Sequence, residues 1–569
     1  MQQKIWVYKS AFLNRTEVEN FAKKYGISLV MAVVFLNRGI DTEEKLKSYL
    51  KKSLDSIYNP MLLPDMEEAC KRIKKAVDNN EKITIYGDYD ADGVTSTSIL
   101  YTFLSKAGAD VDYYIPDRFK DGYGLNIMAI NKISKSGTKL LITVDCGITS
   151  CGEVQLAKAQ GMDVIVTDHH TPQEKIPETF VIDPKRADSE YPFRELAGVG
   201  VAFKLILGLG MIMGMKSSEV FEEYVELAAI GTIADVVPLK EENRVIVDRG
   251  MSALSKTENP GINALIEIAC LKKENLNTTS IAFGLSPRIN ASGRMGNAKS
   301  SVDLFLEEKR DEAYKKALEL DSQNRKRQET EKKIIDEALK KIDEDCNFDK
   351  KKVIVLSGEG WHHGVIGIVA AKLTEKFYKP CIMISEENGL GKGSSRSIPE
   401  FNIFDALTNC SDLLTKYGGH AQAAGLSLSM ADFDAFSEKI NKYASSKLTD
   451  EDMVKKIIID CRIKPADVNI EYAKALEKLE PFGEGNERPV FAICGIKAAM
   501  IGRIGAEGRH LRLKVFDGTK YINCVGFGMG DYADEIKEGE ILDIAFSMDI
   551  NDFGGNRNLQ LILKDIKKA

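Results

Sequence analysis

The 569-residue sequence lacks several features that would place it in a class at once. It has no run of about 18 uninterrupted apolar residues, so we expect no membrane-spanning helix. Its first residues, MQQKIWVYKSAFL, lack the apolar core and small-residue cleavage site of a secretory signal. The ten cysteines include no CxxC pair, which argues against a disulfide framework and against a zinc knuckle. We therefore expect a cytoplasmic protein with no membrane partner.

The sequence also lacks the motif GxxxxGK[ST], which excludes a P-loop nucleotidase at motif level. A net charge of −7 is more typical of an acidic metabolic enzyme than of a nucleic-acid-binding protein. This bulk charge decides little, because bound metal ions would offset acidic residues and basic patches can be local. The length suits roughly three or four domains of about 150 residues each.

The most informative feature present is a set of acidic residues with two adjacent histidines. They are Asp88, Asp90, Asp92, Asp145, Asp168, His169, His170 and Asp235. Between residues 82 and 240, short runs such as ITIYG, LLITV and DVIVT alternate with amphipathic stretches. That alternation predicts strands and helices of a largely parallel sheet. Most of the acids follow directly after a predicted strand, at the edge where open α/β sheets bind ligands.

Carboxylates this dense repel one another and lose hydration unless a cation lies among them. Oxygen ligands with imidazole suit Mn²⁺ or Mg²⁺, so the sequence predicts a metal site, most simply for two ions. A single DxD can instead be a helix N-cap with a turn, but one cap does not need three aspartates. Asp168 could orient an imidazole rather than bind metal directly. Gly147 would let the backbone turn closely beneath the ions.

The rest of the chain divides by pattern. We predict an N-terminal segment plus the first α/β domain over 1–302, and a connecting helix over 303–345, which has no Gly or Pro. A second α/β domain is predicted over 346–447, and a small β-barrel over 448–569. Several segments outside the acids combine Arg or Ser with Gly-rich backbone suited to phosphate oxygens: PDRFKDGYGLN, LSPRINASGRMG and GLGKGSSRSIPEFNI. Each alone is most simply a solvated loop, but together they favour a phosphate-ester substrate.

These motifs resemble a known family. GDYDADGVTS, VDCGI, TDHH and IADVVPL are similar, in order and spacing, to the four motifs of the DHH phosphoesterase superfamily. PRINASGR, GWHHGVIGIVAAKL, GSSRS and GGHAQAAG resemble motifs of the RecJ single-strand-specific exonucleases, and PFGEGNERPVF precedes a barrel like their oligonucleotide-binding (OB) fold. The resemblance implies a multidomain α/β fold: a parallel-sheet DHH domain, a long helix, a DHH-associated domain and an OB barrel. It implies a 5′→3′ exonuclease that releases 5′-mononucleotides from single-stranded DNA in repair and recombination, with Mn²⁺ or Mg²⁺.

Carried over residue by residue, the resemblance also implies the site. The metal ligands fall on Asp88, Asp90, Asp92, Asp145, His169 and Asp235. Asp145 would bridge the two ions, and the catalytic set would be Asp145, Asp168 and His170, with His170 facing the scissile phosphate. The substrate ligands fall on Arg118, Arg288, Arg294, Ser394, Arg396 and His420. Arg288 and Arg294 both fit the same family arginine, so the sequence leaves that choice open.

Other functions stay open at this stage. The nearest is a DHH nano-RNase or cyclic-dinucleotide phosphodiesterase, and another is a non-catalytic scaffold that grips single strands. An inorganic pyrophosphatase would not need the barrel. The partner implied by the family is single-stranded DNA with a 5′ end, together with a helicase and a single-strand-binding protein that no segment specifies. A monomer fits a chain with domains on both sides of a groove.

Overall fold

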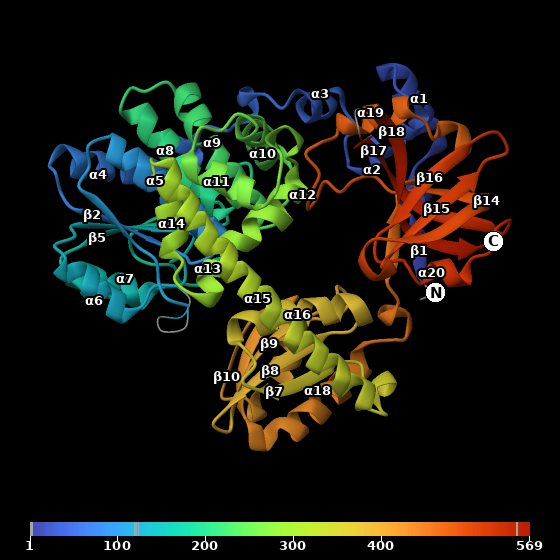
Figure 1. Ribbon diagram of the computed structural model, residues 1–569. Helices are drawn as coiled ribbons and strands as arrows, with labels where there is room; N and C mark the ends of the chain where they lie inside the picture. Colours follow the sequence, from blue (N-terminus) through green and yellow to red (C-terminus); the bar gives the residue numbers. More distant parts are fainter. Residues whose placement is uncertain (1–3, 119–121, 123, 554–555) are drawn as a thin grey trace.

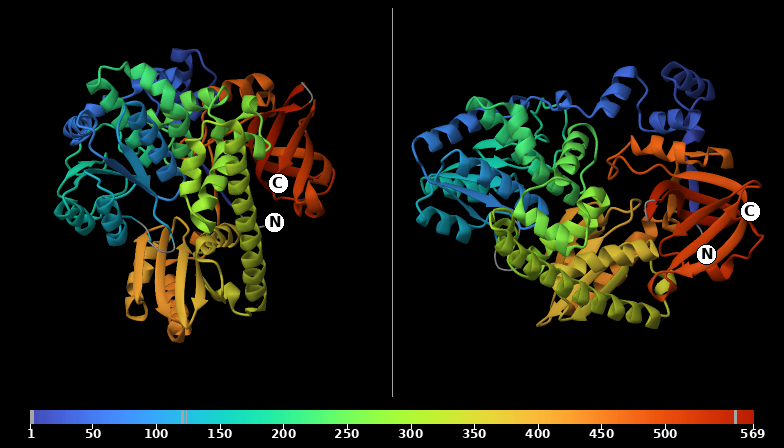
Figure 2. Two further views of the ribbon diagram at one scale, coloured as in Figure 1. Left: turned by 60° about the vertical axis from the view of Figure 1, so that its left-hand side comes forward. Right: turned by 45° about the horizontal axis from the view of Figure 1, so that its top comes forward.

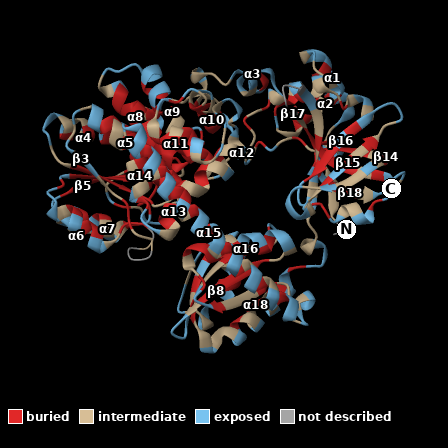
Figure 3. Cartoon of the chain, viewed as in Figure 1, coloured by how far each residue is buried: buried red, intermediate tan, exposed pale blue. Residues whose placement is uncertain are grey.

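The computed structural model describes residues 4–118, 122, 124–553 and 556–569. The chain forms three lobes, which Figures 1 and 2 show from three directions. Each lobe has its own buried core, drawn in red in Figure 3. Within the described part of the chain, no helix combines the length and the apolarity needed to cross a bilayer.

The first lobe is built on a five-stranded sheet in the order β3-β2-β4-β5-β6, in which every neighbouring pair is parallel. The strands are β2 (Ile83–Gly87), β3 (Val111–Tyr114), β4 (Leu140–Val144), β5 (Asp163–Thr167) and β6 (Phe180–Ile182). In β4, Leu140 and Ile142 pack into one core while Leu141 packs into another, because successive side chains point to opposite faces. The predicted parallel sheet is confirmed, and its apolar runs reflect burial on both faces.

Helices cover both faces of this sheet. One face is covered by α6 (Ile127–Lys135) and α7 (Cys151–Ala159), and the other by α4 (Met66–Asp78), α5 (Ala91–Lys106) and α8 (Gly198–Ile212). Further helices extend the lobe: α9 (Ser217–Ala234), α10 (Glu241–Leu254), α11 (Pro260–Ile268), α13 (Ser286–Met295) and α14 (Lys299–Phe305). α5 packs against both α8 and α9, so the loop that starts α5 is held from two sides.

The connecting helix α15 (Arg310–Glu344) runs from the first lobe to the second, as Figure 1 shows. Its N-terminal part packs with α11 and α13, and its later part packs with α16. Ala313 and Leu320 belong to the first lobe's core, whereas Ile334 and Ile342 belong to a core shared with α16. The helix is therefore a structural bridge between two cores.

The second lobe contains a five-stranded mixed sheet in the order β10-β11-β9-β8-β7. Its strands are β7 (Ile354–Glu359), β8 (Cys381–Glu387), β9 (Leu390–Arg396), β10 (Lys416–His420) and β11 (Ala423–Ser429). Its helices are α16 (His363–Phe377), α17 (Ile403–Asn409) and α18 (Phe433–Lys447). The second α/β unit predicted from the sequence is thus present.

The third lobe is a barrel. Its strands are β13 (Cys461–Arg462), β14 (Phe491–Ile504), β15 (His510–Phe516), β16 (Tyr521–Gly526), β17 (Ile541–Phe553) and β18 (Asn556–Lys568). They follow the order β13-β14-β15-β16-β18-β17, and an additional pairing of β14 with β17 closes the sheet. A closed sheet has no long exposed edge. The small barrel expected from the sequence is confirmed.

The N-terminal segment belongs with the barrel rather than with the first lobe. β1 (Ile5–Tyr8) pairs in parallel with β12 (Lys456–Ile459), and α1 (Arg15–Tyr25) and α2 (Leu29–Asn37) share a core with the barrel strands. α3 (Glu43–Lys51) then leads back to the first lobe. The sequence analysis placed this segment beside the first α/β domain within 1–302, and the described core contacts of α1 and α2 are with the barrel, because an apolar helix face does not reveal its partner in sequence.

Candidate active site

The three aspartates after β2 occupy one tight turn into α5. Asp90 is the N-cap of α5, and its Oδ1 accepts from the amides of Asp92 and Gly93 at 3.0 and 3.1 Å. A Cβ on Gly93 would lie 2.5–2.6 Å from backbone atoms of Asp88, so only glycine allows this turn. Asp90 therefore has the capping role considered from the sequence, and the carboxylates of Asp88 and Asp92 take no part in this cap.

Asp92 joins this turn to the start of α8. Its carboxylate oxygens accept from the amides of Gly198 and Val199, both at 2.7 Å. A helix N-terminus stabilises a negative charge placed in this way. Gly198 has a second role, because a Cβ there would lie 2.5 Å from Oδ1 of Asp145. The first turn of α8 therefore fixes the spacing of two acids that are far apart in sequence.

Asp145 follows β4 directly and has a left-handed backbone, with φ of 60°. This conformation is uncommon for a residue other than glycine and concentrates at functional sites. Gly147, at φ 113°, continues the turn, and a Cβ there would meet Thr143 Oγ1 at 2.8 Å. The close turn predicted at Gly147 is present, and Asp145 itself takes part in it.

Asp168 is committed to hydrogen bonds. Its Oδ1 accepts from the amides of His169 and His170 and lies 2.7 Å from His170 Nδ1, while Oδ2 accepts from the amide of Ile148 at 2.9 Å. Burial, the largest single cause, raises the pKa of Asp168, but the hydrogen bond and the charge of His170 together with the hydrogen bond from the Ile148 amide outweigh it, so the pKa is lowered. Of the two roles considered from the sequence, this geometry fits orientation of an imidazole better than metal ligation.

The imidazole of His169 lies at the centre of the acids. Its Nε2 is 3.2 Å from Asp145 Oδ1, 3.7 Å from Asp235 Oδ2 and 3.9 Å from Asp92 Oδ2. Asp235 reaches this point from the C-terminal end of α9, which it caps. Three groups have ligand atoms within 4.8 Å of one another: Asp92 with His169 and Asp235, Asp88 with Asp90 and Asp145, and Asp145 with His169 and His170. Asp145 belongs to two of these groups.

We use the name acidic edge for the eight residues described so far, in which acids outnumber histidines: Asp88, Asp90, Asp92, Asp145, Asp168, His169, His170 and Asp235. Burial first, and then a neighbouring aspartate, raises the pKa of Asp88, Asp92 and Asp145 well above the usual range. Burial and the charge of Asp90 raise the pKa of Asp235 to about 7.

The pKa values of the two histidines of the acidic edge shift in opposite directions. Burial and the charge of His170 lower the pKa of His169 to about 3, which favours the neutral imidazole that binds metals. For His170, burial lowers the pKa but the hydrogen bond and charge of Asp168 raise it above its ordinary value.

Several buried ligand atoms of the acidic edge have no hydrogen-bond partner among the described residues. They are Asp88 Oδ1, His169 Nδ1, His169 Nε2 and Asp235 Oδ2. Buried polar atoms are normally satisfied, so orphan oxygens facing an orphan imidazole need an explanation. The donor set, carboxylates with neutral imidazole, fits divalent cations such as Mn²⁺ or Mg²⁺.

A cluster of arginines lies next to the acidic edge, at the junction of the first and second lobes. The Arg118 guanidinium lies 5.2 Å from the ring centroid of Tyr89, which stands between two of the acids. Arg294, at the end of α13, donates to the carbonyl of Gly364 at the start of α16, at 3.0 Å. Arg396, on β9, donates to the carbonyl of Ser395 at 2.7 Å. We call Arg118, Arg294, Arg396 and Ser394 the arginine cluster.

The positive charge of one arginine in this cluster lowers the pKa of another. Burial and the charge of Arg118 lower the pKa of Arg294 to about 10, and the same causes lower the pKa of Arg396. The polar contacts of Arg294 and Arg396 in the described chain are with carbonyl and hydroxyl oxygens rather than carboxylates. Gly367 of α16 makes room for Ser394, since a Cβ there would lie 2.8 Å from Ser394 Oγ. The arrangement is suited to an anion with several oxygens.

Two of the predicted substrate ligands, Arg288 and His420, lie outside the arginine cluster. Arg288 is bound within the protein, with Nε 2.9 Å from Asp321 Oδ1 of α15 and Nη1 2.6 Å from the carbonyl of Gly284. Its guanidinium is thus neutralised, whereas Arg294 forms no ion pair with a carboxylate of the described residues. His420 is exposed on β10 and pairs in register with Ala423, which pairs with Arg396 on β9. His420 is therefore level with Arg396 but two strands away.

The sequence did not mark the polar middle of α15 as part of this region. Arg327 is buried, donates to Glu331 and Asn324 at 2.5 and 2.6 Å, and its charge contributes to the lowered pKa of Arg294. Asn290 holds the start of α5, accepting from the amide of Ala91 at 2.8 Å. The available signal for Arg327 was its place on the buried stripe of α15, where a charged residue is unusual.

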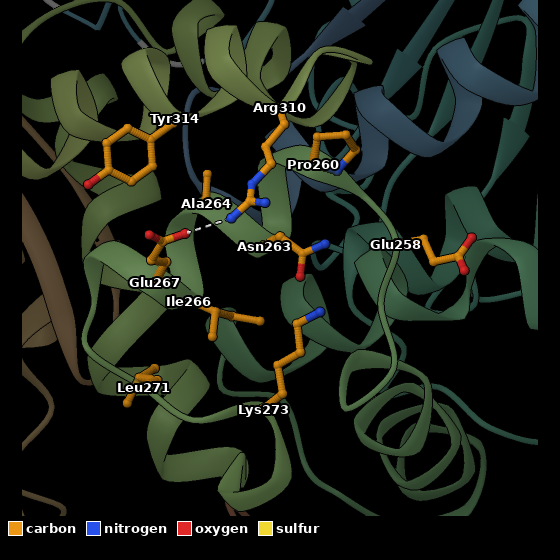
Figure 4. A pocket seen from close by; sticks show the side chains of 10 residues that line it. All are labelled: Glu258, Pro260, Asn263, Ala264, Ile266, Glu267, Leu271, Lys273, Arg310 and Tyr314. Carbon is orange, nitrogen blue, oxygen red and sulfur yellow. Dashed lines mark ion pairs between the residues drawn. The ribbon is translucent and has the colours of Figure 1, made fainter.

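A separate pocket of about 480 Å³ lies between α11 and the start of α15. Figure 4 shows Arg310 and Glu267 facing each other across it, and their charged atoms are 3.8 Å apart. Lys273, on its rim, donates to the carbonyl of Thr257. None of the predicted site residues lines this pocket, so the chemistry proposed from the sequence lies elsewhere.

Comparison with family models divides the chain into three matched parts. Residues 82–232 match the DHH family N-terminal domain, residues 350–446 the DHHA1 domain, and residues 459–565 the RecJ OB domain. These matches fall on the parallel sheet, the second α/β lobe and the barrel.

Curated relatives and solved structures agree with these matches. The chain is 39% identical, over 97% of its own length and 70% of the relative's, to the single-stranded-DNA-specific exonuclease RecJ of Bacillus subtilis. It is 34% identical to the Salmonella typhimurium protein of the same name, covering 94% of this chain and 95% of that one. Among solved structures, RecJ from Thermus thermophilus in complex with Mn²⁺ aligns with a TM-score of 0.83 and 29% identity, covering 100% of this chain and 79% of that one. An exonuclease RecJ bound to manganese aligns with a TM-score of 0.60 and 35% identity, covering 68% and 96%.

Proposed function

Because this chain belongs to the RecJ family of single-stranded-DNA-specific exonucleases, we propose that it hydrolyses single-stranded DNA from the 5′ end and releases 5′-mononucleotides. The observation that carries the proposal is the acidic edge, whose orphan buried oxygens and imidazole fit divalent cations. It lies beside an arginine cluster in which Arg294 and Arg396 pair with no carboxylate of the described residues. DNA repair and recombination are the processes in which such an activity is used.

We assign two metal positions to the acidic edge. Asp88, Asp90 and Asp145 would hold one Mn²⁺ or Mg²⁺, and Asp92, Asp145, His169 and Asp235 would hold the other, with Asp145 shared. When bound, two such ions supply an activated nucleophile and stabilise the charge that develops at the phosphate. The neutral form of His169, favoured by burial, keeps its ring nitrogen available as a ligand.

The remaining residues would position the strand and handle a proton. Asp168 fixes the ring of His170 through Nδ1, so His170 Nε2 is assigned to the scissile phosphate, where it can donate a proton. Arg118, Arg294, Arg396 and Ser394 would hold the terminal 5′ phosphate and so set the register of the first nucleotide. Arg288 is assigned a structural role instead, because Asp321 already neutralises it. His420 is assigned to the path of the strand beyond Arg396.

We further propose that a monomer in the cytoplasm performs this reaction, with single strands supplied by a helicase and a single-strand-binding protein. Every group assigned above comes from one chain, which supports a monomer. The barrel lobe, matched to the RecJ OB domain, would bind the strand away from its end.

The test is digestion of labelled oligonucleotides that differ in length, polarity and end chemistry, with Mn²⁺ and with EDTA. We expect mononucleotides from 5′-phosphorylated single strands, no reaction with EDTA, and little reaction with blunt duplexes. Preferential cleavage of dinucleotides would instead indicate a nano-RNase or cyclic-dinucleotide phosphodiesterase. Binding of single strands without any hydrolysis would indicate a scaffold, and hydrolysis of pyrophosphate alone would indicate a pyrophosphatase.

A further inference from the structure

Val236 follows directly after Asp235, where helix α9 ends, and its backbone is left-handed, with φ of 61°. Among the described non-glycine residues with a positive φ, it is the only one with a β-branched side chain. Such a side chain is rare in this region, because its Cβ crowds the following carbonyl oxygen. The conformation persists only where the surrounding structure imposes it, and it concentrates at functional sites.

The segment around Val236 is held on both sides. On one side, Asp235 Oδ2 lies 3.7 Å from His169 Nε2 in the acidic edge. On the other side, the amide of Leu239 donates to the carbonyl of Glu484 at 2.7 Å, within the part of the chain that matches the RecJ OB domain. A short turn therefore joins a proposed metal ligand to the barrel lobe, and Val236 takes up the change of direction between them.

The side chain of Val236 does not stabilise the fold. It is 63% exposed and belongs to none of the described cores, whereas Val237 and Leu239 pack with cores of the first lobe. Single exposed apolar side chains are common, but this one is kept in a backbone conformation that glycine or asparagine adopts at less cost. The isopropyl group therefore needs a role outside folding.

Val236 lies at one end of the path that a strand would take. Its Cα is about 3.8 Å from that of Asp235, which belongs to one of the two proposed metal positions. The arginine cluster approaches the other position, where the Arg118 guanidinium lies 5.2 Å from the ring centroid of Tyr89. A strand held by its 5′ phosphate at the arginines and by the barrel lobe farther on would leave the acidic edge beside Val236.

We propose that Val236 packs against the base of the nucleotide on the 3′ side of the scissile phosphate; this inference rests on the function proposed above. An aliphatic side chain can cover the face of any base, because apolar contact is not directional. It therefore positions the incoming nucleotide without selecting its sequence. The contact is present in both the bound and the reacting state, so its loss should raise KM and leave kcat nearly unchanged.

The test measures KM and kcat in Mn²⁺ on 5′-phosphorylated oligo(dT). Two further substrates carry a tetrahydrofuran abasic unit as the first or as the second residue. With the native chain, an abasic second residue should raise KM by about fivefold. Val236→Gly should raise KM on the intact strand by the same factor, and an abasic second residue should then have no further effect. An abasic first residue should affect both proteins equally.

Two more measurements separate base contact from a structural role. Val236→Gly should raise the unfolding temperature by about 2–4 °C, because the strain is removed, and calorimetry without DNA should show native Mn²⁺ affinity. The conservative variant Val236→Ile should keep the dependence of KM on the second base.

Cys270→Gly is the matched control. Cys270 is exposed, has φ of 55° and follows the end of α11, outside the acidic edge. Its replacement should give a similar rise in unfolding temperature with native KM.

Four results in Val236→Gly would overturn the inference: native KM, an undiminished effect of the abasic second residue, weaker Mn²⁺ binding, or a lower unfolding temperature. Each of these leaves the proposed function intact. A native chain that hydrolyses no single strand would instead refute the proposed function and this inference together.

Discussion

The acidic edge and the arginine cluster are opposite in charge but similar in construction. Each gathers buried or half-buried like charges, and burial together with like charge shifts the pKa of Asp145 and of Arg294 toward the neutral form. They differ in where their residues come from. The acids are all held by the first lobe, mostly in turns directly after its strands, whereas Arg396 and Ser394 come from the second lobe. Metal binding should therefore need one folded lobe, while recognition of a 5′ end should need two lobes in register.

The strongest way to break this comparison is to remove Asp145, the acid that we assign to both proposed metal positions. Asp145→Ala should reduce hydrolysis of single-stranded DNA by at least about 10³-fold, since both metal positions lose a ligand. Binding of single strands, measured by fluorescence anisotropy, should change little. The control is Asp163→Ala, an exposed acid on β5 of the same sheet, which should leave activity unchanged. Turnover near the native rate in Asp145→Ala would refute the shared role.

A smaller loss is expected from the residue that orients His170. Asp168→Asn should lower the rate by about 10–100-fold, the range found for groups that orient a functional imidazole. If Asp168 acts through His170, the double variant Asp168→Asn/His170→Gln should be no slower than His170→Gln alone. Additive losses, measured as kcat on one oligonucleotide, would instead give Asp168 an independent role.

Arg294 and Arg288 allow a test of whether an arginine without an ion pair and an arginine paired with Asp321 have different roles. Arg294→Gln should reduce the preference for 5′-phosphorylated over 5′-hydroxyl ends by about tenfold, because a charge-assisted hydrogen bond is lost. Arg288→Gln should keep the preference and lower the unfolding temperature, because it leaves Asp321 without one of its partners. Competition assays with paired substrates measure the preference. The reverse pattern would exchange the two roles.

The smallest effect concerns stability of the metal-free protein against pH. Asp235 has a folded pKa of about 7 against an ordinary 3.8, so its contribution is fully present below 3.8 and is lost as pH rises through 7. The pKa is raised in the same way for Asp88, Asp92 and Asp145. His169 opposes them only below its ordinary 6.5, where the unfolded chain takes up a proton that the folded chain refuses.

From pH 6.5 to 8, the unfolding temperature in EDTA should therefore fall, by on the order of 5 °C. Saturating Mn²⁺ should remove or reverse this slope, because ligands bind metal in their deprotonated form. A metal-free protein whose unfolding temperature rises over this interval would show that the acids are not crowded as described. Differential scanning fluorimetry at constant ionic strength is sufficient.

The sequence by itself determined the elements and the residue types of the site. The strands ITIYG, LLITV and DVIVT are where their apolar runs predict them, and the acids that follow them share one edge, because parallel strands end together. These features depend on local spacing and on the two-residue repeat of side-chain direction along a strand, both of which are present in the sequence.

Only the tertiary structure decided which partners these segments have. The sequence could not separate Arg288 from Arg294, because Asp321 lies 33 residues after Arg288 and reaches it only when α15 packs on α13. It could not assign α1 and α2 to the barrel, since an apolar helix face fits any apolar partner. It also gave no sign that the start of α8 would hold Asp92 and Asp145. Burial, ion pairing and lobe contacts depend on distances between residues remote in sequence, and no local pattern encodes those distances.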